Sequence, residues 1–197
     1  MRKKTSKILF VNMVFAPILI LGGLSFFGKS VPVENQVVTS ASFLENSSNL
    51  VEVVYFGYVG CAFICPTSLY TVGEVIDEIN AELPGTTLGG YFVDVNTATQ
   101  PSIAHEYSRF FSDAIVGVNT EAGELENLRS LFGITVFETN RDMDEIIHTD
   151  HYFIVTKKGA DWRIAKILAN DSSRSELKSE ILLALKEVSD PIILANY

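Results

Sequence analysis

The sequence predicts a mixed α/β domain that follows an apolar N-terminal segment. Three patterns support this prediction: a strand, a helix and a second strand follow one another, a β-hairpin comes later, and an amphipathic helix ends the domain. The 197 residues suffice for one domain plus a short appendage and exclude a second domain of full size. With 47% hydrophobic and 20% charged residues, the chain has the composition of a folded protein.

An apolar run at the N-terminus predicts a membrane anchor. Residues 8–27 are almost continuously apolar and follow a cluster of four basic residues. Twenty helical residues span about 30 Å, the thickness of the hydrocarbon layer, whereas a cleaved signal has an apolar core of about 7–15 residues and a small-residue cleavage site. No clean site follows the run. We therefore expect an uncleaved anchor over residues 1–28 with its basic end in the cytoplasm, and a cleaved export signal is the alternative.

The rest of the chain is strongly acidic. Five of the 15 basic residues lie in the first 30 positions, and none of the 24 acidic residues does. An acidic surface repels phosphate backbones, and no basic stripe interleaved with aromatic residues is present. This excludes nucleic acid as a partner. After the anchor we expect a polar linker over 29–48, a domain over 49–190 and a tail over 191–197.

The first elements of the domain follow from the spacing of its apolar residues. Residues 50–56 form a run of β-branched and aromatic residues that is typical of a buried strand. Apolar residues at helical spacing follow Pro66 and continue until Pro84, and residues 88–93 form a second strand. Strand, helix and strand in this order imply a right-handed crossover and a parallel pair.

Two helices are predicted after the second strand. The first covers residues 102–111, and the second lies near residues 124–132. In the first of these helices, the residues expected to face the core are Ile103, Tyr107 and either Phe110 or Phe111.

A hairpin and a last helix complete the domain. Strands at 152–156 and 162–168 are joined by a turn that contains Gly159. A capping box, Ser173-x-x-Glu176, begins the last helix. The resulting order, β-α-β-α-α-β-β-α with a cysteine pair after the first strand, is that of a thioredoxin-like domain.

The two cysteines of the chain, Cys61 and Cys65, lie between the first strand and its helix. Unpaired amide N–H groups and the helix dipole favour the thiolate there. Three intervening residues suit two sulfurs on one metal ion, and the loop can still close to a disulfide. Thiolate pairs select soft ions such as Cu(I), and an added imidazole makes a site that can also hold Cu(II). A structural disulfide stays the alternative, although a bridge across so small a loop stabilises little.

Three histidines are candidates for the third ligand. His105 is expected on the solvated face of its helix, and His151 is expected to pack within its strand. His148 precedes that strand in a polar turn, and in a thioredoxin-like fold the loop entering this strand lies against the cysteine loop. We therefore predict a metal site of Cys61, Cys65 and His148.

Residues 54–69 resemble the Sco/SenC family of membrane-tethered copper-binding proteins. The family pattern is Phe-Gly-Tyr-x-x-Cys-x-x-x-Cys-Pro-x-x-Leu, and the family histidine, usually followed by Ser or Thr, stands eleven residues before the glycine of the hairpin turn. Here His148 stands eleven residues before Gly159. The resemblance extends over most of residues 50–188.

The resemblance implies a copper chaperone rather than an enzyme that turns over a substrate. The implied ligands of the copper ion are Cys61, Cys65 and His148, and the implied role is to help load the copper centre of cytochrome c oxidase. The expected partner is a subunit of that oxidase or another copper chaperone. The expected location is the inner membrane, with a single span and the domain on the periplasmic side. The alternative is a thiol–disulfide oxidoreductase in which the two cysteines are the catalytic redox pair and keep client cysteines reduced.

Three departures from the family pattern remove acidic residues around the predicted site. Ala62 and Phe63 follow the first cysteine where the family often has Pro and an acidic residue. A family loop with two acidic residues keeps the first as Asp94 but has Ala98 at the second, and Ile147 stands where an Asp is frequent. We expect these changes to favour disulfide exchange with clients.

Overall fold

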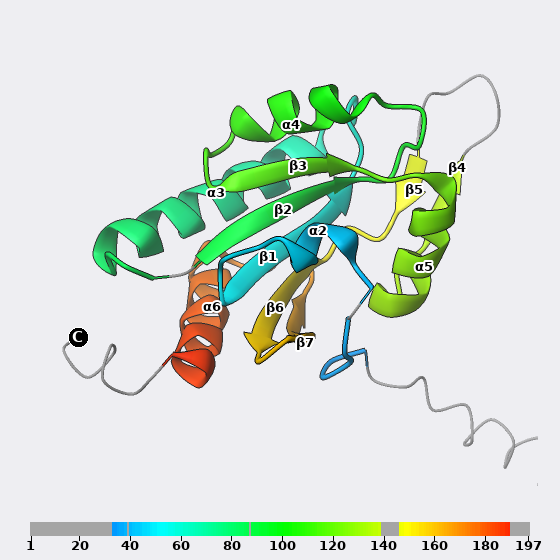
Figure 1. Cartoon of the computed structure of the whole chain (residues 1–197). Coiled ribbons are helices and arrows are strands. Elements are labelled where there is room, and N and C mark those ends of the chain that lie inside the picture. The colour runs from blue at the N-terminus through cyan, green and yellow to red at the C-terminus, as the bar shows by residue number, and fades with distance from the viewer. Residues whose placement is uncertain (1–32, 39, 87, 139–145, 190–197) are drawn as a thin grey trace, which may run out of the picture. The chain divides into compact units, whose positions relative to one another are not determined.

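A five-stranded sheet in the order β3-β2-β1-β6-β7 forms the centre of the part of the chain that the structure describes (Figure 1). The computed structural model describes residues 33–38, 40–86, 88–138 and 146–189. The strands of the sheet are β1 (Val51–Gly57), β2 (Leu88–Asp94), β3 (Ile115–Asn119), β6 (Tyr152–Lys158) and β7 (Asp161–Leu168). The central strand β1 pairs parallel with β2 and antiparallel with β6. The predicted α/β class is confirmed.

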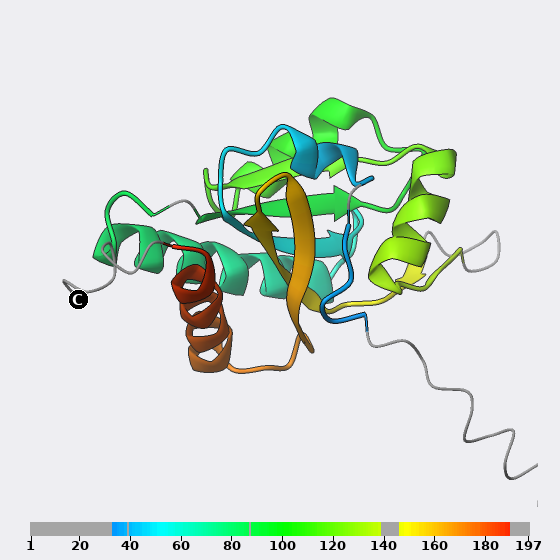
Figure 2. The same cartoon turned by 60° about the horizontal axis from the view of Figure 1, so that its bottom comes forward.

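Helices cover both faces of this sheet (Figure 2). On one face lie α3 (Ile64–Glu82), α4 (Pro101–Arg109) and α6 (Arg174–Val188), and on the other lie α2 (Ser42–Glu45) and α5 (Ala122–Phe132). All seven residues of β1 are buried because the strand packs against both layers. Its Tyr55 enters the core under α3, and its neighbour Phe56 enters the core under α5.

The end of α3, the start of α6 and the turn between β6 and β7 lie where the sequence predicts them. The helix α3 stops at Glu82, just before Pro84, and the side chain of Ser173 accepts a hydrogen bond from the Glu176 N–H at the start of α6. The turn between β6 and β7 places Gly159 at φ 66°, a left-handed conformation that glycine adopts without strain. The predicted cap and hairpin are confirmed.

The packing of α4 confirms part of the prediction. Tyr107 and Phe111 pack against the core, but Ile103 is 42% exposed and Ala104 is fully buried instead. The reason lies in Gly117 of β3: a Cβ atom there would lie 1.9 Å from the carbonyl oxygen of Ala104. The helix therefore approaches the sheet through a small residue, and its larger neighbour Ile103 is turned outward.

Three short strands were not predicted. They are β3 at the edge of the main sheet and the two strands of a separate hairpin, β4 (Val136–Glu138) and β5 (Ile146–His148). His148, which the sequence places in a turn, is the last residue of β5. The hairpin lies beside the ends of the central strands where the cysteine loop begins (Figure 1).

Much of the predicted linker packs on the domain. Within residues 33–48, the N–H of Asn35 donates to the carbonyl of Ile164 at 2.7 Å and that of Val38 donates to Trp162 at 2.9 Å, so this segment continues the sheet beyond β7. Leu44 of α2 is fully buried. The predicted anchor over 1–28 and tail over 191–197 lie outside the described residues. Among the helices that are described, none is both long and apolar enough for a membrane span.

Candidate metal centre

The loop between β1 and α3 carries both cysteines. Cys61 lies in a turn in which its N–H donates to the Tyr58 carbonyl at 3.3 Å, and Gly60 provides the left-handed residue, with φ 103°. Cys65 lies in the first turn of α3 and is fully buried, whereas Cys61 is half-buried. The backbone N–H of Cys65 donates to the Cys61 sulfur at 3.4 Å. The first turn of α3 therefore holds the half-buried Cys61 sulfur close to the buried Cys65.

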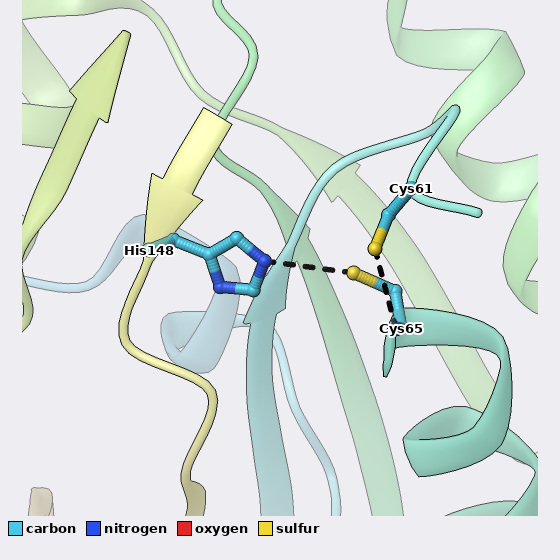
Figure 3. Close-up of side chains that lie close together, drawn as sticks. All are labelled: Cys61, Cys65 and His148. Atoms are coloured by element: carbon cyan, nitrogen blue, oxygen red, sulfur yellow. Dashed lines mark hydrogen bonds between the residues drawn. The ribbon is translucent and has the colours of Figure 1, made fainter. Parts of the chain in front are cut away.

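The histidine reaches these cysteines from the separate hairpin. The Nδ1 atom of His148 lies 3.0 Å from the carbonyl oxygen of Thr149. A carbonyl can only accept, so this nitrogen carries the proton and the lone pair of the neutral ring is on Nε2. That Nε2 atom lies 3.6 Å from the sulfur of Cys65, whose thiol can donate to it (Figure 3).

Thr149 also fixes the base of the hairpin. Its N–H donates to the Thr135 carbonyl at 2.9 Å, and its hydroxyl oxygen accepts from the Thr135 N–H at 2.9 Å. The rings of Tyr55 and Tyr58 meet the imidazole of His148 nearly edge to face, at centroid distances of 6.5 and 5.8 Å. These contacts restrict the ring from several sides.

The two sulfurs and one nitrogen of His148 all lie within 4.8 Å of one another (Figure 3). These are the three ligands that the sequence predicts. The other two histidines lie apart from the group: His105 is exposed on α4, as predicted, and His151 precedes β6, with its Nδ1 atom 3.5 Å from a carboxylate oxygen of Asp150. Two sulfurs and an imidazole suit a soft or borderline ion such as copper.

The two thiols differ in acidity. Partial burial works to raise the pKa of Cys61, but hydrogen bonds from the start of α3, led by the N–H of Cys65, bring it below the ordinary value. Burial, together with the neighbouring Cys61, raises the pKa of Cys65 to about 12. At neutral pH Cys61 is therefore the more reactive sulfur, and Cys65 keeps its proton.

A cavity of about 520 Å³ opens beside Cys61 and His148. Asp150 is the one carboxylate among the described residues that line it, and no motif in the sequence indicates this residue. Asp94, the acidic residue that the chain shares with the family loop, is fully buried at the end of β2, opposite Gly57 of β1. Burial raises the pKa of Asp94, while the N–H of Asn96 donates to this carboxylate at 2.8 Å.

Gly57 is a further residue of the site, and the sequence indicates it only as part of a motif. A Cβ atom at this position would lie 2.9 Å from the sulfur of Cys65 and 3.0 Å from the ring of Phe92. The absence of a side chain therefore lets the buried thiol lie directly against β1. The signal was present in the run Phe56-Gly57-Tyr58, but only the packed structure gives its reason.

Comparison with known protein families gives one match over most of the chain. The sequence profile of the family described as SCO1/SenC matches residues 33–185. The human protein named "Protein SCO1 homolog, mitochondrial" is 26% identical over 131 residues, which are 66% of this chain and 43% of that protein. The SCO2-like protein of Rickettsia felis is 23% identical over 131 residues, which cover 64% of this chain and 62% of that protein. The chain thus matches less than two thirds of the length of either relative.

Solved structures share the fold. The crystal structure of Arabidopsis thaliana ScoI with copper bound superposes with a TM-score of 0.63 at 19% identity, over 71% of this chain and 86% of that one. Yeast Sco1 with copper bound gives a TM-score of 0.60 at 18% identity, over 75% and 82% of the two chains. The mixed α/β arrangement around a central sheet is therefore that of these proteins.

Proposed function

The chain belongs to the SCO1/SenC family, and from this premise we propose that it holds one copper ion through Cys61, Cys65 and His148 and passes it to a partner during assembly of cytochrome c oxidase. The copper ion is cargo in this proposal. The protein binds and releases it without a catalytic turnover.

One observation carries the proposal: three ligand atoms from two separate elements converge within 4.8 Å. Two thiolates stabilise Cu(I), and the imidazole adds a nitrogen ligand that Cu(II) prefers. The Nε2 atom already faces the sulfur of Cys65, so binding requires the loss of thiol protons and no rotation of the ring.

The relatives support copper as the ion and oxidase assembly as the setting. Related structures from Arabidopsis and yeast contain copper. Another relative, BsSco, is described as a member of the Sco family of cytochrome c oxidase assembly proteins; it gives a TM-score of 0.51 at 15% identity over 74% of this chain and 84% of that one. We propose a subunit of that oxidase, or a second copper chaperone, as the partner.

A second candidate function is thiol–disulfide exchange, which the unequal acidity of the two cysteines favours. The Cys61 thiolate would attack a client disulfide and form a mixed disulfide, and Cys65 would then displace the reduced client and leave a Cys61–Cys65 bond. A disulfide switch has been identified in the related protein BsSco. The same two sulfurs would serve both functions.

Anaerobic titration of the reduced full chain tests the first function. We expect one equivalent of Cu(I), or of Cu(II), to bind, and Cys61→Ser or Cys65→Ser to abolish uptake. A chain that takes up no copper but reduces the disulfides of insulin would have the second function instead.

We further propose that residues 1–28 remain attached and hold the domain at the periplasmic face of the inner membrane. The support is the match between the length of the apolar run and the bilayer, together with the basic cluster before it. Cell fractionation followed by N-terminal sequencing is the test. A protein found free of the membrane, with an N-terminus near Lys29, would contradict an uncleaved anchor.

A further inference from the structure

We propose that exposed apolar side chains around the metal centre form a docking surface for an apolar segment of a client protein that carries a cysteine. We call this surface the apolar rim and define it by Phe63, Ile64 and Ile147, which all line the cavity beside Cys61. The inference rests on the proposed function, because both metal transfer and disulfide exchange need a client sulfur at this opening.

The rim residues are large, apolar and unusually exposed. Phe63 is 84% exposed and Ile147 is 54% exposed, and both line the cavity beside Cys61, as does Ile64. The rim therefore has two parts, one on the cysteine loop and one on the strand pair that carries His148.

The size of the rim fits a brief contact. Its three side chains together expose on the order of 300 Å² of apolar surface, which is typical of functional patches on single proteins. A stable complex buries about 800 Å² on each partner. The rim is too small to hold a second copy of this chain permanently, but a carrier that must release its cargo needs a contact of this strength.

The charges around the rim also limit the occupant. Asp150 is the one carboxylate among the described residues of the cavity, and the chain beyond residue 30 carries all 24 acidic residues against ten basic ones. An anionic lipid surface would be repelled by such a domain. A partner segment without charge, whose apolar side chains cover the rim, meets no such barrier.

The client must also carry sulfur. An ion held by thiolates moves readily only to ligands of similar softness, and a disulfide exchanges only with another sulfur. Phe63 and Ile147 stand at positions where the resemblance described above leads us to expect acidic residues. The rim is thus a departure of this chain from the family pattern. It favours a client whose cysteine has apolar residues beside it.

The test measures how fast Cys61 of the full chain, in nanodiscs of zwitterionic lipid, forms a mixed disulfide with short peptides. Each peptide holds one cysteine bonded to thionitrobenzoate, flanked by either Leu and Phe or Ser and Gly. The Cys61 thiolate attacks the peptide sulfur, a new sulfur–sulfur bond forms, and the coloured thionitrobenzoate anion leaves. The reference protein of this assay carries Cys65→Ser and is called the parent. It lacks the second cysteine that would otherwise attack the mixed disulfide and release the peptide.

In this parent we expect the apolar peptide to react about tenfold faster than the polar one, because its side chains bury rim surface. The ratio of the two rates should fall toward one in Phe63→Ser and in Ile147→Ser. Phe110→Ser is the matched control, since Phe110 is 85% exposed on a different surface, and it should keep the ratio of the parent. Taking a ratio removes any change in the intrinsic reactivity of Cys61.

A ratio that is the same in the rim variants and in the parent would overturn the proposal. The proposal would also be overturned if added lipid vesicles slowed the reaction of the parent with the apolar peptide but not that of the rim variants. The rim would then be a membrane contact. A self-interface would be identified instead if Cys61 of a second copy attacked the Cys61–peptide disulfide, released the peptide thiolate and joined the two copies faster than the peptide adduct forms. Copper titration of the chain and its rim variants, with Cys65 intact, distinguishes failure of the metal site from failure of the docking surface. A chain that binds no copper refutes the proposed metal function. Copper binding together with an unchanged ratio of peptide rates in the rim variants refutes only the docking surface.

Discussion

The Nε2 atom of His148 lies 3.6 Å from the sulfur of Cys65, although 83 positions separate the two residues in the chain. The cysteine belongs to the first turn of α3 and the histidine to the end of β5, so the contact joins the main α/β body to the small hairpin. An ion bound there would connect these two elements directly. The hairpin therefore controls whether the third ligand is available.

Replacing His148 by Ala should weaken Cu(II) binding by more than about tenfold and affect Cu(I) much less. Loss of groups that merely orient a metal ligand costs about 10–100-fold, and here a ligand itself is lost, while both sulfurs remain for the softer ion. Competition titrations with each oxidation state measure the two affinities. His105→Ala, on the exposed side of α4, is the control. Equal Cu(II) affinity in wild type and His148→Ala would remove this residue from the site.

Thr149 should act as a positioning residue for His148. The Thr149→Val variant keeps the shape of the side chain but loses the oxygen that accepts from the Thr135 N–H. We expect Cu(II) affinity to fall about tenfold, with Cu(I) affinity nearly unchanged, and Thr149→Ser to restore it because the hydroxyl returns. If Thr149→Ser were as weak as Thr149→Val, the hydrogen bond would not be the cause.

Gly57→Ala should disturb the buried thiol. The added Cβ would lie 2.9 Å from the Cys65 sulfur, so we expect a loss of about 1–3 kcal/mol in the free energy of unfolding, together with weaker copper binding. Gly123→Ala is the matched control, because no atom lies within 4 Å of the added Cβ. Urea unfolding of both variants gives the comparison. An unchanged stability of Gly57→Ala would mean that the strand and helix move apart at little cost.

Glu52 should make the stability of the domain depend on pH. It is 2% exposed, its Oε1 atom accepts from Ser47 and Asn49, and its Oε2 atom has no hydrogen-bond partner among the described residues. Burial raises its pKa in the folded state, and the two hydrogen bonds only partly oppose this. The native protein thus binds the proton more tightly than the unfolded chain does, so this contribution to stability is full below the unfolded pKa and is lost as pH rises through the folded one.

Glu52→Gln removes this titration and nearly keeps the shape of the side chain. We expect the variant to be more stable than wild type at pH 8, on the order of 1 kcal/mol or more, and this gap to shrink toward pH 4. Urea unfolding across this pH range measures it. A gap independent of pH would show that Glu52 does not titrate between the two states.

Local patterns were enough to predict the elements that depend on neighbouring residues. The β1 run, the helix that follows the cysteines and the cap at Ser173 are encoded within a few positions each. The ligand set could be proposed because a known pattern links Cys61 and Cys65 to a histidine near the hairpin. The strands β4 and β5 have three residues each, which is too few to show an alternation of apolar and polar residues. His148 is therefore predicted in a turn.

Other features arise only when separate elements meet. The outward position of Ile103 follows from the approach of α4 to Gly117, and the pairing of Asn35 and Val38 with β7 depends on an edge that exists only after the sheet has formed. A polar segment before the first strand gives no local sign of such pairing. The role of Gly57 likewise depends on the position of Cys65 in the folded protein.

Copper uptake by the full chain before and after oxidation tests the proposed centre most directly. A metal ligand must be a free thiolate, whereas a Cys61–Cys65 disulfide would leave His148 as the one remaining ligand of the three. The chain is oxidised, the loss of free thiols is verified, and copper is titrated before and after reduction. The proposal predicts one equivalent of copper in the reduced chain and none in the oxidised chain. Equal uptake in both states would mean that the cysteines are not the ligands, and the copper site would be refuted.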